Sequence, residues 1–136
     1  LVEQRHEDAI REMIEARHGY APDSLHTMAN TPGRSGDIGT IETFSGQHEL
    51  TDSNRTMQLF ALEDTSHVVP MVVAYLPADR ILFESDLYTP GSPAATPDST
   101  SLFESIEALE LRIDTIVGGH GATAEFSELA EVSKGS

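Results

Sequence analysis

The chain is organised around MVVAYLPADRILFESDLY, residues 71–88. Residues 71–75 are continuously apolar with β-branched residues at their centre, which predicts a strand buried on both faces. Residues 76–79 predict a turn, because proline fixes φ and aspartate can accept hydrogen bonds from its own backbone. Residues 80–84 then return as a second strand. We therefore predict an apolar hairpin that ends at a single buried acid, Asp86.

Two histidines follow hydrophobic segments in the same way. His67 comes shortly after strand-like residues 55–62, and His120 comes shortly after strand-like residues 113–117. Alone, Asp86 is equally well explained as a turn or capping residue, and each histidine as a surface or turn residue. Together the three side chains predict a metal site. Because zinc bonds to nitrogen and oxygen ligands are about 2 Å long, we expect them to converge within a few ångströms of one point.

Length and composition limit the class of protein. The 136 residues predict a single domain with one core, and the absence of cysteine leaves only His, Asp and Glu as metal ligands. A net charge of −15 repels phosphate backbones and predicts no nucleic-acid partner. No segment reaches the roughly 20 apolar residues of a membrane span, and no signal peptide is visible. We therefore expect a cytoplasmic protein with no membrane partner.

The first third of the chain predicts one helix and a long connection. Residues 3–17 have a helical apolar stripe, with Glu7 four residues before Arg11. Gly19 and Pro22 predict the end of this helix. Residues 21–39 are rich in Pro, Gly, Ser, Thr and Asn, which predicts an irregular connection.

The remaining segments predict strands mixed with helices. A short strand at 41–44 is expected to pair with residues 48–50 across a turn, and residues 51–54 predict a second turn. After a proline-rich loop, Pro97 begins a helix with a Ser101/Glu104 capping box and an apolar face. The apolar face of this helix is expected to consist of Leu102, Phe103, Ile106 and Leu109. A strand over residues 113–117 and a last helix over residues 125–132 are expected to follow. The expected order is helix, strands, helix, strand, helix.

Residues 55–132 resemble the C-terminal half of a metallo-β-lactamase-fold hydrolase. The resemblance rests on the loop histidine His67, the LP..RILF..D pattern that ends at Asp86, and GGHG around His120. Two shorter segments, APDSL at 21–25 and LTDSNRTMQL at 50–59, also resemble the approach to this half. The resemblance implies an α/β (α+β) fold, half of an αββα sandwich with a mixed sheet flanked by helices. In that single domain, 1–136, residues 1–55 are the helix and connection and 56–136 form the core.

The resemblance also implies a site and a chemistry. His67 matches the third histidine of the family's first metal position, and His120 matches the histidine of the second. Asp86 matches the bridging aspartate, which makes it both a metal ligand and the expected catalytic residue. Zinc, or another divalent metal such as manganese or iron, suits these donors. The implied reaction is attack by metal-activated water on a small-molecule ester, thioester, lactone, lactam or phosphodiester.

One family motif is missing from the chain. HxHxDH occurs nowhere in the sequence, and His6 and His18 lack the spacing to replace it. The chain is then either the C-terminal part of a longer hydrolase or a truncated, catalytically inactive half-domain that serves as a dimeric assembly or binding module. In both cases we predict that the isolated chain binds divalent metal weakly or not at all, because the bridging aspartate has lost partners that set its geometry.

A lone half of the sandwich also predicts an uncovered sheet face. The hairpin at 71–88 directs apolar side chains to both faces of the sheet, and the three predicted helices can cover only one. We therefore expect a homodimer in which a second copy covers the other face. The alternative is that residues 1–50 fold back over that face and keep the chain monomeric.

Overall fold

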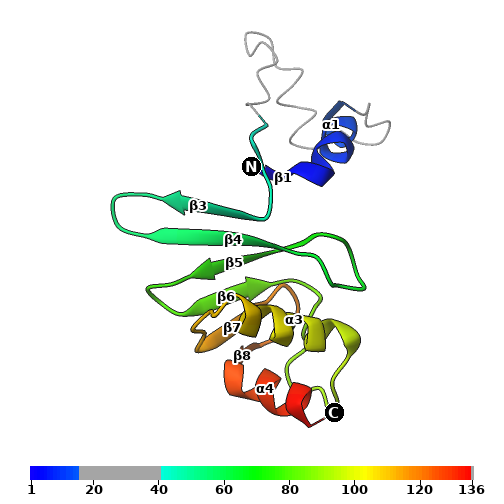
Figure 1. Cartoon of the computed structure of the whole chain (residues 1–136), viewed down its shortest axis with the longest axis vertical. Coiled ribbons are helices and arrows are strands. Elements are labelled where there is room, and N and C mark those ends of the chain that lie inside the picture. Colours follow the sequence, from blue (N-terminus) through cyan, green and yellow to red (C-terminus); the bar gives the residue numbers. More distant parts are fainter. Residues whose placement is uncertain (16–40, 136) are drawn as a thin grey trace. The chain divides into compact units, whose positions relative to one another are not determined.

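A mixed six-stranded β-sheet is the largest element of the chain (Figure 1). The computed structural model describes residues 1–15 and 41–135, which belong to two units, Leu1–Phe44 and Ser45–Ser136. Four earlier expectations lie outside the described residues: the helix end at Gly19 and Pro22, the connection over 21–39, the segment at 21–25 and the position of His18.

The first unit contains a helix and two short strands. Its elements are β1 (Val2–Glu3), the 3₁₀ turn η1 (Gln4–His6), α1 (Glu7–Glu15) and β2 (Thr43–Phe44). The predicted pair is present, with Arg11 Nη2 2.6 Å from Glu7 Oε1. The predicted pairing of residues 41–44 with 48–50 is wrong, because β2 pairs in parallel with β1. Pairing with a strand distant in sequence therefore replaces the expected local hairpin.

The second unit contains the six-stranded sheet, in the order β3-β4-β5-β6-β7-β8. Its strands are β3 (Gln47–Thr51), β4 (Thr56–Leu62), β5 (Met71–Leu76), β6 (Ile81–Glu84), β7 (Thr115–Gly118) and β8 (Thr123–Glu125). Neighbouring strands are antiparallel except β6 and β7, which are parallel and are connected through helix α3 (Pro97–Ala108). The predicted hairpin corresponds to β5 and β6. The short strand β8 was not predicted.

The turns predicted at residues 51–54 and 76–79 are both present, the first held by an aspartate side chain and the second by a backbone hydrogen bond. Asp52 Oδ1 accepts hydrogen bonds from the backbone amides of Asn54 and Arg55, each at 2.7 Å. These bonds lower the pKa of Asp52, and the bond from the Asn54 amide has the larger effect. In the β5–β6 turn, the Asp79 amide donates to the Leu76 carbonyl at 3.2 Å. The register of these two hairpins is thereby set locally.

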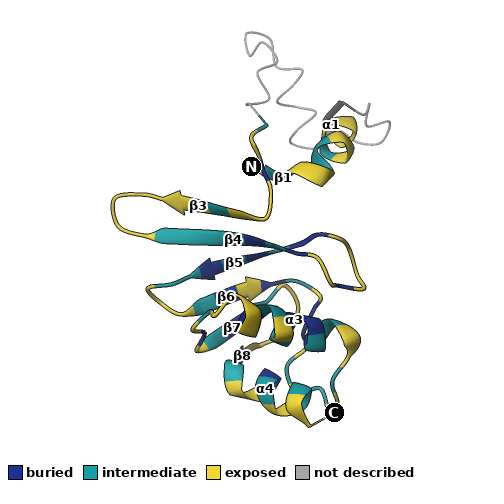
Figure 2. Cartoon of the chain, viewed as in Figure 1, coloured by how far each residue is buried: buried dark blue, intermediate teal, exposed yellow. Residues whose placement is uncertain are grey.

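The core lies on one face of the sheet. Side chains alternate along each strand, and the set that includes Phe60, Val73, Leu82 and Ile116 is buried. This set forms one cluster with Leu102 and other residues of the helices. Figure 2 shows buried residues on β4, β5 and α3, whereas β3 is mostly exposed.

The opposite face of the sheet is apolar but not buried. The expectation that residues 71–75 form a strand buried on both faces is therefore wrong, since Val72 and Ala74 are only partly buried and Phe83, on the adjacent strand, is 48% exposed. Strand register places its neighbours Ala74 and Val117 on the same face. We call this surface the open sheet face; its apolar residues are Leu50, Met57, Leu59, Ala61, Val72, Ala74, Leu76, Ile81, Phe83 and Val117. Strand register places His48, Thr115, Thr123 and Glu125 on the same face.

Two helices cover the buried face. Helix α3 begins with a capping box formed by Thr96 and Ser99, so the predicted Ser101/Glu104 box is wrong. Ser101 instead donates to the Asp64 carbonyl. Helix α4 (Phe126–Lys134) confirms the last predicted helix. Among the described residues, no helix has the length and apolar character needed to cross a membrane.

Candidate metal-binding site

Three strands end at the same edge of the sheet. Strand β5 is antiparallel to both β4 and β6, and β7 is parallel to β6, so β4, β6 and β7 run in one direction. The loops after these strands carry His67, Asp86 and His120 respectively. Because the three strands run in one direction, the side chains that follow them lie at the same edge of the sheet.

The structure brings the three predicted site residues together. His120 Nε2 lies 3.2 Å from Asp86 Oδ1, and His67 Nε2 lies 3.8 Å from Asp86 Oδ2. The side chains are 81% exposed for His120, 53% for His67 and 37% for Asp86. The expectation that Asp86 is buried is wrong. The aspartate instead presents one carboxylate oxygen to each histidine at an accessible surface.

The loop that carries His67 is held against the start of α3. Ser66 donates from its amide to Asp98 Oδ1 at 2.8 Å, and its hydroxyl lies 2.9 Å from both Asp98 oxygens. The Ser101 hydroxyl donates to the Asp64 carbonyl in the same loop. Asp98 lies in the first turn of α3, where the helix dipole favours a negative charge. These contacts fix the loop on both sides of Thr65, two residues before the exposed His67.

Asp86 occupies an unusual backbone conformation. Its φ is +67°, a left-handed value that aspartate adopts more readily than most residues. The Ser85 hydroxyl donates to Asp86 Oδ2 at 3.0 Å. The carboxylate therefore has a fixed hydrogen-bond donor on the side of His67.

A buried acid, Glu84, lies directly before this loop, and the sequence analysis missed it. Glu84 is 1% exposed, and its Oε2 accepts from the amides of Leu87 at 2.8 Å and Tyr88 at 3.4 Å. Its Oε1 is buried with no hydrogen-bond partner. Burial raises the pKa of Glu84, the two amide bonds oppose that rise, and the nearby Asp86 charge adds to it.

The raised pKa of Glu84 predicts a pH-dependent effect of Glu84→Gln on stability. A carboxyl group whose pKa is higher in the folded chain than the ordinary 4.5 stabilises the fold below that value and loses this contribution as pH rises through the folded pKa. Glutamine does not titrate. The free energy of unfolding of Glu84→Gln minus that of the natural chain should therefore increase from about pH 4 to about pH 7, measured by urea denaturation. A difference that stays constant or decreases would contradict this assignment.

Two glycines allow the His120 loop to approach Glu84 and Ser85. A Cβ on Gly118 would lie 2.8 Å from the His120 carbonyl oxygen and 3.3 Å from Glu84 Oε1. A Cβ on Gly119 would lie 2.6 Å from Ser85 Oγ. Close packing therefore requires glycine at two positions of the GGHG segment: Gly118, against the His120 backbone and Glu84, and Gly119, against Ser85.

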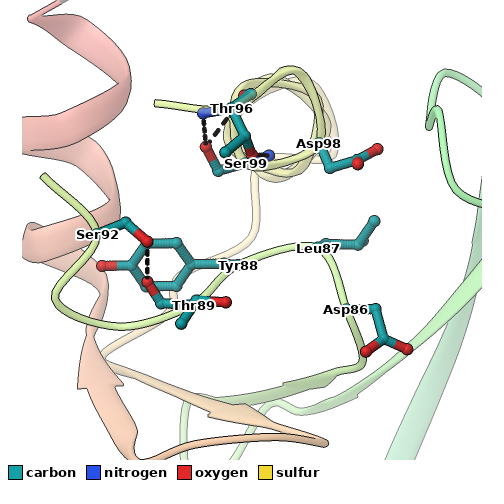
Figure 3. Close-up of a pocket in the computed structure, with 8 residues that line it drawn as sticks. All are labelled: Asp86, Leu87, Tyr88, Thr89, Ser92, Thr96, Asp98 and Ser99. Carbon is teal, nitrogen blue, oxygen red and sulfur yellow. Dashed lines mark hydrogen bonds between the residues drawn. The ribbon is translucent and has the colours of Figure 1, made fainter. Parts of the chain in front are cut away.

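A small pocket adjoins Asp86. It has a volume of about 180 Å³ and extends from Asp86 to the N-terminal end of α3 (Figure 3). Burial, followed by the charge of Glu128, raises the pKa of Tyr88 in its wall. The lining residues are Asp86, Leu87, Tyr88, Thr89, Ser92, Thr96, Asp98 and Ser99. With two aspartates and no cationic side chain in its lining, this pocket favours neutral or cationic groups.

His67, Asp86 and His120 are of residue types that bind divalent metals, but their arrangement does not complete a metal site. Imidazole nitrogen and carboxylate oxygen are ligands for zinc, manganese and iron. In the described ranges 1–15 and 41–135, however, no group of three or more His, Cys, Asp or Glu side chains is arranged to hold a metal ion. The two histidines approach different oxygens of Asp86, so this part of the chain offers one imidazole on each side of a carboxylate.

Comparison with known proteins identifies the fold. No protein-family model matches the sequence, and no curated protein matches it. Among solved structures, the chain is similar to a metallo-β-lactamase from Pontibacter korlensis, with 18% identity and a TM-score of 0.55 over 73% of this chain and 50% of that one. It is also similar to DIM-1 metallo-β-lactamase, with 20% identity and a TM-score of 0.51 over 68% of this chain and 45% of that one.

A third similar structure is the sec-alkyl sulfatase PisA1, with 14% identity and a TM-score of 0.51 over 71% of this chain and 18% of that one. The chain thus spans about half the length of the metallo-β-lactamases that it matches. At these identities the similarity shows the fold. The chain has the α/β architecture of half of a metallo-β-lactamase fold, which confirms the resemblance predicted from the sequence.

Proposed function

We propose that this chain supplies part of the metal site of a metal-dependent hydrolase. The observation that carries the proposal is the position of Asp86 between two histidine Nε2 atoms, at 3.2 and 3.8 Å from its two oxygens. Three loops from separate strands meet there, although the residues are far apart in sequence. The metallo-β-lactamase fold of the chain and the metallo-β-lactamases among its structural neighbours support the reaction class.

The roles proposed for the three residues follow from their positions. Asp86 would hold a divalent metal through its carboxylate, and His67 and His120 would each supply one imidazole nitrogen as a ligand. A bound divalent metal would polarise a substrate carbonyl or phosphoryl group and lower the pKa of water to about 7. Small-molecule esters, thioesters, lactones, lactams and phosphodiesters are the substrate classes that this chemistry serves.

Metal titration of the isolated chain is expected to reveal a weak site. Calorimetry with Zn²⁺ should give no dissociation constant below about 10 µM, because the described donors do not complete a metal site. Excess Mn²⁺, which broadens nearby NMR signals, should broaden those of His67, Asp86 and His120 before those of β3. The metal-loaded isolated chain is expected to hydrolyse neither a generic ester nor a lactam.

A matched pair of variants tests whether the weak site is the proposed one. Asp86→Asn should abolish the selective broadening, whereas Asp52→Asn, which changes an exposed turn aspartate, should leave it intact. Broadening that is unaffected by Asp86→Asn would refute the site. Tight zinc binding that disappears in His120→Ala would instead show that the chain completes a metal centre without further ligands.

A second candidate function, a dimeric assembly or binding module, is favoured by the open sheet face. Ten apolar side chains occupy that face, none of them is buried, and none belongs to the core cluster that the helices cover. Exposed apolar surfaces of this kind commonly mark sites of protein association. The occupant we propose is a second copy of the chain, which has the same apolar face and could pair with it about a two-fold axis.

A further inference from the structure

We infer that Glu84 is the positioning residue that holds the Asp86 and His120 loops together. The relevance of this role to metal binding rests on the proposed function, whereas the contacts of Glu84 do not depend on it. The Glu84 side chain contacts the loop that carries Asp86, and its backbone contacts the loop that carries His120. No other acid of the second unit is buried.

The side chain of Glu84 closes the loop around Asp86. Its Oε2 accepts hydrogen bonds from the amides of Leu87 and Tyr88, the two residues that follow Asp86. A left-handed residue is sparsely populated in a free chain and persists where surrounding contacts determine it. The bonds to Glu84 supply such contacts immediately after the turn at Asp86, which fixes the direction of its carboxylate.

The backbone and the second side-chain oxygen of Glu84 face the His120 loop. The Gly119 amide donates to the Glu84 carbonyl at 2.8 Å. Glu84 Oε1 lies 3.3 Å from the point where a Cβ on Gly118 would be, so Gly118 leaves room for the carboxylate. Strand register pairs Glu84 with Gly118 directly. One buried residue thus sets the separation between the loops of Asp86 and His120.

If the side chain at position 84 only filled space in the core, it would not need a carboxylate. A buried acid with an unpaired oxygen is disfavoured relative to an apolar side chain of similar size. The arrangement is explained if the amide acceptors are needed to place Asp86. A glutamine should serve nearly as well, because its carbonyl oxygen can accept the same two amide bonds.

NMR of the imidazole Cε1–H signals tests this role without any metal. Asp86→Ala defines how far the His67 and His120 signals shift when the carboxylate is removed. Glu84→Met, which keeps the side-chain length but has no oxygen acceptor, should reproduce more than half of that shift for both histidines. Glu84→Gln should produce only a small part of it. His48, on β3, is the internal control and should not shift.

A double variant separates positioning from an independent effect. If Glu84 acts through Asp86, adding Glu84→Met to Asp86→Ala should shift the two histidine signals no further. A folded Glu84→Met whose His67 and His120 signals remain at their natural positions would overturn the inference. Additive shifts in the double variant would also overturn it.

Loss of folding is a separate outcome with a definite meaning. If Glu84→Met does not fold, Glu84→Asp takes its place, since its carboxylate is one methylene shorter and withdraws from the Leu87 amide. If neither variant folds, Glu84 is required by the fold as a whole and the inference is overturned. If the NMR shifts appear but Asp86→Asn leaves the Mn²⁺ broadening unchanged, the positioning role stands and the proposed metal site fails.

Discussion

Leu82→Ala is expected to lower the free energy of unfolding by about 3 to 5 kcal/mol, the range for a fully buried leucine. Leu82 is 0% exposed at the centre of the sheet, between Tyr75 on β5 and Ile116 on β7. It belongs to the cluster that joins the sheet to both helices. Because small domains are stabilised by only about 5 to 15 kcal/mol, such a loss would remove a large part of the stability of the second unit.

Urea denaturation monitored by circular dichroism measures this effect. Leu109→Ala is the matched control, because Leu109 is the exposed C-cap residue of α3 and its truncation should change stability by about 0.5 kcal/mol or less. Equal destabilisation by the two variants would contradict the assignment of the core to one face of the sheet.

The hairpin and the main helices could be predicted because their sequence patterns are local. Residues 71–76 are apolar and β-branched, and Pro77 begins a turn, so little else competes with a hairpin there. The start of α3 was harder, since Thr96/Ser99 and Ser101/Glu104 both place side chains three residues apart. In the structure the helix begins at Pro97, so Thr96 is its N-cap and Ser101 lies inside it, with its hydroxyl bonded to the Asp64 carbonyl.

Other features depend on contacts that the sequence pattern does not contain. Strand β8 is only three residues long and exists because Ala124 pairs with Ile116 on β7. The segment 41–44 pairs with β1 rather than with its sequence neighbour. In both places long-range pairing overrides the local propensity.

Part of the candidate site followed from the sequence, and part did not. The three residues could be selected because each follows a strand, but their approach at one edge depends on the parallel pairing of β6 and β7. Glu84 could have been found by alternation, since it shares a face with the buried Leu82 two residues earlier. The prediction assigned the buried acid to Asp86 in the loop, whereas the alternation of side chains along the strand indicates Glu84.

The open sheet face predicts that the chain dimerises and that Phe83→Asp weakens the dimer at least about 100-fold, or about 2.7 kcal/mol. Phe83 is 48% exposed at the middle of this face, beside Ala74 and Val117. An aspartate there would place an unpaired charge in an apolar interface, which is costly. Sedimentation equilibrium over a range of micromolar concentrations measures the dissociation constant of the natural chain and of the variant.

The net charge of −15 requires a control for simple repulsion between copies. Phe83→Asp adds a negative charge to each copy, whereas Phe83→Lys reduces the negative charge. If burial of an apolar face holds the dimer, both variants must dissociate it, and salt should strengthen the natural dimer by screening repulsion. Recovery of the dimer in Phe83→Lys would assign the effect of Phe83→Asp to charge alone. A natural chain that sediments as a 14.7 kDa monomer at every concentration would refute the dimer.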